Sequence, residues 1–403
     1  MENPIGLIAG RTPGLRVAMV TETYPPEVNG VARTVGLMAE GLRGRGHSVQ
    51  LVRPRQHRAE HPAREKGFEE QLLRGLPIPR YAQLRLGLPA ARRLARIWSV
   101  RRPDVVHVAT EGPLGWSAIA AADKLGVPVA TDFHTNFHAY SSHYGFAWLR
   151  HVVAGYLRRF HNRIGCTMVP TRELADALTR LGFERLRVVG RGVDSAMFSP
   201  AYRSRELRAQ WGAVDTTLVA MCVSRLAPEK NLDVVLDAFR AMRRVRPGMK
   251  LVLVGDGPLR AQLARGEEGV ILAGKRTGRE LSEHYASADV FLFPSVTETF
   301  GNVTLEAMAS GLAVVAYRYA AAREHLEHAQ SALLPEFGDR DDFIGSAVML
   351  AHDPELARAL GRTARERAER LSWDRAFADF EAVLRDVSRT PPQPAAELQN
   401  VPG

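Results

Sequence analysis

Residues 288–311 read A-D-V-F-L-F-P-S-V-T-E-T-F-G-N-V-T-L-E-A-M-A-S-G. The apolar run up to Pro294 has the length and the closing proline of a buried strand. After Gly301 the apolar residues recur at helical spacing, and Gly311 stands where a helix stop is expected. The segment therefore predicts a strand, a loop and a helix in succession.

The loop between that strand and that helix is a candidate anion site. The first turn of a helix offers free backbone N–H groups and the positive end of the helix dipole. Glu298 and Glu306 stand on either side of this turn, and carboxylates accept hydrogen bonds from sugar hydroxyls. We interpret the combination as a nucleotide-sugar site; the alternative is that both glutamates are surface and helix-face charges.

Strand-like and helix-like segments alternate along most of the chain, and such alternation predicts parallel sheets built from βαβ units. A loop-like passage at residues 191–200 interrupts the rhythm, so we expect two doubly wound α/β domains joined near residue 200. Ligands of such sheets bind at the carboxyl ends of the strands, so the expected site is the cleft between the domains. The predicted strands are residues 16–21, 48–53, 105–109, 127–133, 166–170, 186–190, 217–224, 249–255, 270–273, 290–294 and 313–317.

The length of 403 residues suits two domains of about 200 residues each. No apolar run approaches the roughly 20 residues that span a bilayer, and the N-terminus has too short an apolar core for a signal peptide. Cys166 and Cys222 each fall in a predicted buried strand, so we expect core residues rather than a disulfide. The expected location is the cytoplasm.

The net charge of +10 is concentrated in the first half of the chain, where residues 1–200 hold 28 Lys and Arg against 16 Asp and Glu. From Arg80 to Arg102 there are seven arginines and no acidic residue. A helix that begins at Pro89 would place Leu94 and Trp98 on one face. Such a basic amphipathic helix suits an anionic membrane surface; the alternative is a solvated helix packed on its own domain.

Three further loops follow predicted strands. Gly30 closes the first loop, where a glycine lets a backbone N–H approach a phosphate, although a simple tight turn explains it equally well. In the second loop, Arg225 and Lys230 would neutralise a diphosphate or be ordinary surface cations. In the third, His134 is expected to face a substrate. A metal site formed by His134 and His138 is disfavoured because no carboxylate or cysteine completes a ligand set.

Two other motifs are interpreted as structural. Gly255-Asp-Gly257 resembles the start of a dinucleotide fingerprint, but Arg260 stands where the third glycine belongs. Asp339 and Asp341 resemble a metal-binding pair, yet they open a predicted helix, where aspartates act as caps and dipole partners.

Taken together, these loops resemble the retaining glycosyltransferases of the GT-B fold, in the large bacterial mannosyl- and glucosyltransferase family known as group 1 or family 4. The resemblance runs from Arg16 to about Arg385. The motifs that carry it are P-P-E-V-N-G-V, G-H-S-V, D-F-H-T, G-V-D-S-A-M-F-S-P, S-R-L-A-P-E-K-N, V-G-D-G-P and the pair of glutamates eight residues apart. It implies two Rossmann-like domains that face a central cleft.

The resemblance implies a role for each site residue. Glu306 matches the glutamate that holds the nucleotide ribose, and Glu298 the one that contacts the hydroxyls of the donor sugar. The turn whose backbone amides meet sugar and phosphate corresponds to Phe300, Gly301, Asn302 and Val303.

The other matches concern the phosphates and the point of attack. Arg225 and Lys230 match the pair that grips the diphosphate, Gly30 the glycine of the phosphate loop, and His134 the histidine beside the sugar. The implied reaction needs no metal and no cofactor. Three positions depart from the family's usual pattern, and they are Asn29, Arg191 and Thr299.

The implied function is transfer of a hexose, with mannose from GDP-mannose expected, to a lipid or glycolipid hydroxyl at the cytoplasmic face of the membrane. UDP-glucose or a related UDP-sugar is the alternative donor, on a diacylglycerol or saccharide acceptor. A sugar-nucleotide epimerase and a non-catalytic basic membrane-binding protein are the rivals, and no nucleic acid is expected as a partner.

The same resemblance divides the chain. Residues 1–200 are expected to bind the acceptor and residues 201–372 the nucleotide sugar. Residues 373–388 are expected to form a helix that returns to the first domain, and residues 389–403 a disordered tail.

Overall fold

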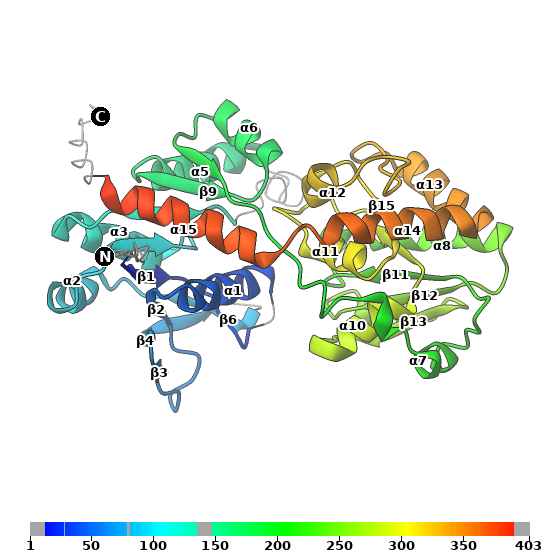
Figure 1. Ribbon diagram of the computed structural model, residues 1–403, viewed down its shortest axis with the longest axis horizontal. Coiled ribbons are helices and arrows are strands. Elements are labelled where there is room, and N and C mark those ends of the chain that lie inside the picture. The colour runs from blue at the N-terminus through cyan, green and yellow to red at the C-terminus, as the bar shows by residue number, and fades with distance from the viewer. Residues whose placement is uncertain (1–12, 28, 79–80, 135–146, 391–403) are drawn as a thin grey trace, which may run out of the picture. The chain divides into compact units, whose positions relative to one another are not determined.

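The computed structural model describes residues 13–27, 29–78, 81–134 and 147–390. It divides into two compact units (Figure 1). The first contains the chain up to residue 133, residues 160–167 and the chain from residue 380 onward; the second contains residues 134–159 and 168–379.

The first sheet has the strand order β10-β9-β8-β7-β1-β2-β4-β3. Strand β1 is parallel to both of its neighbours, β2 and β7, whereas the short β3 is antiparallel to β4. A separate hairpin pairs β5 with β6. The strands are β1 (Arg16–Val20), β2 (Ser48–Pro54), β3 (Arg64–Glu65), β4 (Phe68–Leu73), β5 (Gly75–Ile78), β6 (Tyr81–Gly87), β7 (Val105–Val108), β8 (Val129–Asp132), β9 (Cys166–Val169) and β10 (Leu186–Val188).

The helices that follow these strands start where local signals allow. The side chain of Asn29 accepts a hydrogen bond from the N–H of Ala32 at 2.8 Å and so caps the first helix. The third helix begins at Pro113 without a cap of its own, and Glu22 accepts a hydrogen bond from the N–H of Leu114 at 3.3 Å instead. The helices of this half are α1 (Gly30–Gly44), α2 (Ala91–Val100), α3 (Pro113–Leu125), α5 (Ala147–His161) and α6 (Arg172–Arg180).

Strands β3 to β6 were not predicted. Strand β4 reads F-E-E-Q-L-L, so its polar residues mask the strand pattern. Glu70 can nevertheless be buried in this strand, because its Oε1 forms an ion pair at 3.0 Å with Nε of the buried Arg53 on β2. Buried charges need such a partner, and a sequence pattern does not reveal it.

Helix α2 begins at Ala91, two residues after the predicted start at Pro89, and residues 81–87 before it form strand β6. Leu94 and Trp98 are both 0% exposed in the core of the first unit. The indole N–H of Trp98 donates to Oε1 of Gln50 at 2.7 Å. The apolar face of α2 therefore packs on its own unit, and its arginines are left to solvent.

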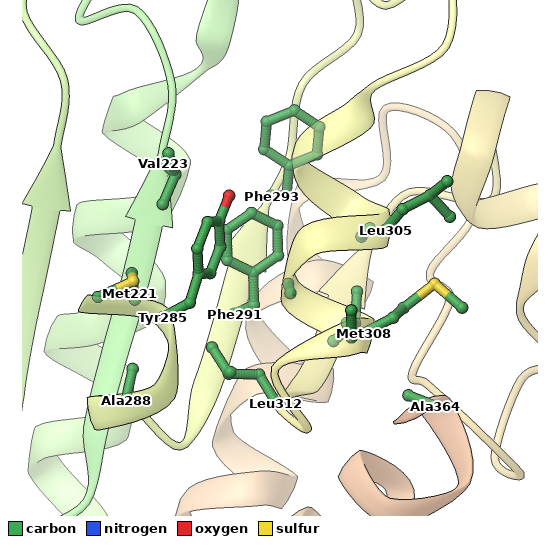
Figure 2. Packing of buried hydrophobic residues seen from close by; sticks show 14 of the residues in the cluster. Met221, Val223, Tyr285, Ala288, Phe291, Phe293, Leu305, Met308, Leu312 and Ala364 are labelled. Atoms are coloured by element: carbon green, nitrogen blue, oxygen red, sulfur yellow. The ribbon is translucent and has the colours of Figure 1, made fainter. Parts of the chain in front are cut away.

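The second sheet is parallel throughout, in the order β13-β12-β11-β14-β15. Successive residues of β11 point to opposite faces, as pleating requires: Met221 packs in one core and Cys222 in the other. Figure 2 shows the first of these cores, where Tyr285 and Phe291 lie beside helix α11. The strands are β11 (Val219–Val223), β12 (Lys250–Val254), β13 (Val270–Gly274), β14 (Val290–Phe293) and β15 (Ala313–Ala316).

Helices cover both faces of the second sheet. Residues of α8 and α13 pack in one core, and residues of α10 and α11 in the other. The predicted cap at Asp339 is confirmed, because its side chain accepts from the N–H of Asp342 at 2.9 Å. The helices are α7 (Arg205–Gln210), α8 (Leu232–Val245), α9 (Arg260–Leu263), α10 (Gly278–Ser287), α11 (Asn302–Ala309), α12 (Ala320–His325), α13 (Arg340–His352), α14 (Pro354–Ala368) and α15 (Trp373–Arg389), with short 3-10 helices η1 (Pro200–Tyr202) and η2 (Pro228–Lys230).

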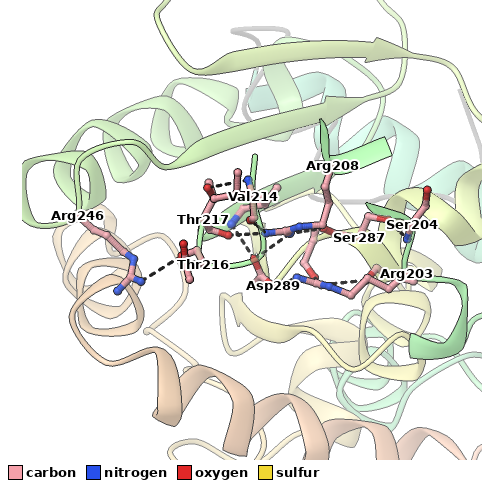
Figure 3. A network of polar contacts seen from close by, with 12 residues as sticks. Arg203, Ser204, Arg208, Val214, Thr216, Thr217, Arg246, Ser287 and Asp289 are labelled. Atoms are coloured by element: carbon pink, nitrogen blue, oxygen red, sulfur yellow. Dashed lines mark hydrogen bonds and ion pairs between the residues drawn. The ribbon is translucent and has the colours of Figure 1, made fainter. Parts of the chain in front are cut away.

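A polar network fixes the segment after residue 200 to this sheet (Figure 3). Asp289, just before β14, lies 2.8 Å from the guanidinium of Arg203 and accepts from the N–H of Val219 at 2.8 Å. The buried Arg208 donates to the carbonyl oxygen of Ser287 at 2.7 Å. The network therefore satisfies the strand ends with side chains from the preceding segment.

From Phe380 onward, helix α15 (red in Figure 1) belongs to the first unit. The ring of Phe380 meets His107 edge-on at 5.0 Å, and Glu381 forms ion pairs with Arg45 and Arg385. The predicted disordered tail lies almost entirely in residues 391–403, outside the described part of the chain.

Cys166 and Cys222 are both buried, as predicted, and neither forms a disulfide among the described residues. Within the described ranges, no helix combines the length and the apolar character needed to cross a bilayer.

Candidate functional site

The order of the second sheet contains a switch point. From β11 the chain proceeds outward to β12 and β13 on one side, and then returns to place β14 and β15 on the other. Ligands of open α/β sheets bind outside the carboxyl ends of the strands at such a point. The loops after β11 and β14, together with helix α11, hold all of the predicted donor-site residues except Gly30 and His134.

Lys230 and Glu298 meet across this switch point. The Nζ of Lys230 forms an ion pair with Oε1 of Glu298, and the hydroxyl of Ser295 donates to the same oxygen at 2.7 Å. The side chains of Lys230 and Glu298 are each 17% exposed. The structure therefore brings together two predicted residues that are 68 positions apart in the chain.

The turn after Glu298 is shaped by Gly301, whose φ of +89° lies in the left-handed region that favours glycine. Helix α11 starts at the next residue, Asn302, without a side-chain cap. The N–H of Thr304 donates to the carbonyl oxygen of Gly301 at 3.0 Å, so an anion at this helix start would meet the N–H groups of Asn302 and Val303. Phe300 is buried, and its carbonyl oxygen accepts from the N–H of Ala321 at 2.8 Å. Val303 packs against the first core.

Glu306 lies inside the second unit and not on its surface. The residue is 3% exposed, and the hydroxyl of Tyr285 donates to its Oε2 at 3.1 Å. The same hydroxyl lies 3.5 Å from the carbonyl oxygen of Val303. Because Glu306 is buried, the alternative that it is a surface charge is wrong. Its burial requires a hydrogen-bond partner, and Tyr285 supplies one.

Arg225 lies in the loop after β11 with a side chain that is 45% exposed. Its Nη1 is 3.6 Å from Oε1 of Glu229. The neighbouring Leu226 donates from its N–H to the carbonyl oxygen of Asp256 at 3.0 Å. A Cβ on Gly255 would collide with the carbonyl oxygen of Ser224. The glycine of the supposed dinucleotide motif thus permits two loops to touch, which agrees with its structural interpretation.

His134 is grouped with the second unit. Its carbonyl oxygen accepts from the hydroxyl of Thr299 at 3.0 Å, beside the turn that carries Glu298. His138 lies outside the described residues. Gly30 is the first residue of α1 in the first unit, where a Cβ would meet nothing within 4 Å. Its role in phosphate binding stays a prediction.

Sequence reasoning missed the residues that hold the two glutamates. Ser295 and Tyr285 donate to their carboxylates, and the hydroxyl of Tyr319 donates to the backbone carbonyl oxygen of Glu298. Ser295 had a usable signal, because it directly follows the strand that ends before Pro294. Tyr285 had none, because its position on α10 looks like an ordinary core aromatic.

The first sheet has a switch point of its own, between β1 and β7, and it too was missed. Glu22 follows β1, and its N–H donates to the hydroxyl of Thr110, which follows β7, at 2.9 Å. Burial raises the pKa of Glu22 to about 7, although the hydrogen bond from Leu114 lowers it and the nearby Glu111 adds to the rise. Nε2 of His161 lies 3.4 Å from Oε1 of Glu111.

Comparison with known proteins identifies the family and the fold. Residues 28–196 match the family described as Glycosyltransferase Family 4, and residues 217–353 the family described as Glycosyl transferases group 1. A GDP-mannose-dependent alpha-mannosyltransferase of Mycobacterium tuberculosis is 33% identical over 92% of this chain and 97% of that protein. An alpha-monoglucosyldiacylglycerol synthase of Acholeplasma laidlawii is 25% identical over 87% of this chain and 92% of that protein.

The solved structure of sucrose-phosphate synthase from Thermosynechococcus elongatus is similar in fold, with a TM-score of 0.77 at 18% identity over 93% of this chain and 99% of that one. The predicted fold class, GT-B with two Rossmann-like domains, is confirmed. With matches to the family along both halves and a relative that is similar over almost its entire length, the chain belongs to the group 1, family 4 glycosyltransferases.

Proposed function

We propose that this glycosyltransferase moves mannose from GDP-mannose to a hydroxyl of a lipid or glycolipid acceptor, with retention of the anomeric configuration and without a metal ion. The donor-binding part of this proposal rests on the Lys230–Glu298 ion pair at the switch point, next to the uncapped start of α11. Diphosphate charge, sugar hydroxyls and ribose each have a partner of suitable chemistry there.

The two glutamates divide the donor between them. Glu306, held by Tyr285, would accept hydrogen bonds from the ribose hydroxyls. Lys230 and Ser295 both donate to Oε1 of Glu298, so Oε2 of Glu298 would accept from a hydroxyl of the donor sugar. When a diphosphate enters, Lys230 would contact both the phosphate and Glu298.

Stabilisation of the negative charge that develops on the diphosphate would accelerate the reaction. As the bond from the anomeric carbon to the diphosphate oxygen breaks, its electron pair goes to the diphosphate and the sugar becomes oxocarbenium-like. The acceptor oxygen attacks from the same face and gives its proton to the leaving phosphate. Arg225, Lys230 and the start of α11 would stabilise the developing negative charge, and His134 would lie beside the sugar.

The identity of the sugar is supported by the mannosyltransferase relative, whose name states GDP-mannose dependence. UDP-glucose is the alternative donor, and the glucosyldiacylglycerol synthase relative favours it. The lipid acceptor is supported by that relative's name and by the basic first half of the chain. We place the protein in the cytoplasm, on the inner face of the membrane.

The test is an assay of GDP and UDP release from GDP-mannose and UDP-glucose, with and without lipid acceptors. Glu298→Gln should lower kcat by about 10²–10³ with donor KM near the wild-type value. The proposed hydrogen bond from the donor-sugar hydroxyl to Glu298 strengthens as the sugar becomes oxocarbenium-like. Glu366→Gln, an exposed carboxylate on α14 of the same unit, is the control and should stay near wild type.

Other outcomes of the same assay would overturn the proposal. Isomerised nucleotide sugar without any acceptor would identify an epimerase. Release of nucleotide that Glu298→Gln leaves intact would remove Glu298 from the reaction.

A further inference from the structure

The β5–β6 hairpin stands apart from the main sheet of the first unit as a two-stranded sheet of its own. Leu76 and Leu86 are directly paired across its two strands, so their side chains lie on the same face. They are 56% and 38% exposed. A two-stranded hairpin is marginally stable in water by itself. Covering the exposed leucine pair would remove apolar surface from water and so be favourable.

The surroundings of the leucine pair are basic. Between Glu70 and Asp104 the sequence holds eight arginines and no acidic residue. Arg74, which directly precedes β5, is exposed and lies two residues before Leu76, so it shares the leucine face, whereas Arg85 lies next to Leu86 in β6 and points to the opposite face. Apolar side chains flanked by arginines are the composition that suits the interface of an anionic bilayer.

Helix α2 cannot supply the apolar part of such a surface. Leu94 and Trp98 are fully buried against the first unit, so a lipid surface would meet only the exposed arginines of this helix, Arg92, Arg93 and Arg96. Val100, the last residue of α2, is 88% exposed, but it is a single small apolar side chain. The apolar contact must therefore come from elsewhere in the basic segment.

We infer that the β5–β6 hairpin docks the protein on an anionic lipid surface. Leu76 and Leu86 enter the interfacial region, and Arg74 meets the lipid phosphates. The arginines of α2 add long-range attraction. This inference rests on the proposed function, because a lipid acceptor must be collected from a membrane, and it assigns that contact to a hairpin instead of to a helix.

The experiment is co-sedimentation of the full chain with vesicles of phosphatidylglycerol and phosphatidylcholine, and with phosphatidylcholine vesicles alone. The wild-type protein should sediment with the anionic vesicles only. The double variant Leu76→Ser, Leu86→Ser should bind about tenfold more weakly or worse, because each leucine loses its apolar transfer energy. Val100→Ser removes a more exposed apolar residue from α2 and should bind as the wild type does.

Folding of the variants is checked by their thermal midpoints, and Leu76→Ser alone, at the more exposed position, serves if the double variant unfolds. Arg74→Gln should weaken binding to anionic vesicles as well. Two results overturn the inference: wild-type protein that ignores anionic vesicles, or hairpin variants that bind them as tightly as Val100→Ser. Nucleotide binding is measured without vesicles, so the donor proposal stands or falls independently.

Discussion

At the scale of single residues, the donor-site proposal depends on how Glu306 is held. Its carboxylate is buried, and the Tyr285 hydroxyl is a neutral donor on a different helix. The tyrosine ring also fills the first core beside Phe291 (Figure 2). Removing the hydroxyl alone therefore separates the polar contact from the packing.

Tyr285→Phe should weaken nucleotide binding and lower stability by about 1 kcal/mol, because the buried carboxylate loses a donor while the ring remains. Isothermal titration with GDP and a denaturant titration measure the two effects. Tyr317→Phe is the matched control, since Tyr317 is equally buried in the second unit but packs in the other core. Equal nucleotide affinity in both variants would contradict a role for Tyr285 in positioning Glu306.

At the scale of elements, the apolar strands that end at a turn residue could be predicted, whereas β4 and β6, two of the three longest strands, could not. The strand and helix around residues 288–311 are seen as β14 and α11. Strand β4 was out of reach, since Glu70 counts as a polar residue in any pattern although Arg53 neutralises it in the fold. The same limit applies to α2. Its sequence allows Trp98 to face either lipid or the core, and only the fold shows that Trp98 is buried and hydrogen-bonded to Gln50.

Helix α15 offers an element-scale prediction about pH. Burial alone would raise the pKa of Glu381, but hydrogen bonds from Arg45, Arg385 and His47 lower it to about 2. Because the folded pKa lies below the ordinary glutamate pKa of 4.5, the stabilisation is present above pH 4.5 and is lost as the pH falls through about 2.

Glu381→Gln should therefore lower the free energy of unfolding at pH 7 by on the order of 1 kcal/mol, with a smaller difference from wild type at pH 3. Denaturant titrations at the two pH values measure this. Asp379→Asn changes an exposed carboxylate on the same helix and should have little effect at either pH. A deficit that stays constant between pH 7 and pH 3 would show that Glu381 does not act through its charge.

At the scale of the whole molecule, the candidate site could be predicted in composition but not in arrangement. Periodicity placed Glu298 at a strand end and Glu306 on a helix, and the family resemblance gave each a role. Their partners come from other segments: Lys230 follows a strand on the other side of the switch point, and Tyr285 lies on α10. Sheet order decides which loops are neighbours, and no local pattern contains it.

The central claim is that the second unit binds a nucleotide sugar through Glu306. The most direct measurement is the thermal midpoint of the wild type, Glu306→Ala and Glu298→Ala with GDP, UDP and ADP and with their sugars. A ligand at 100 times its dissociation constant should stabilise the wild type by about 2.7 kcal/mol. We predict that GDP raises the midpoint of the wild type and of Glu298→Ala, but much less that of Glu306→Ala. No midpoint shift with any nucleotide, or a shift that Glu306→Ala retains in full, would contradict the claim.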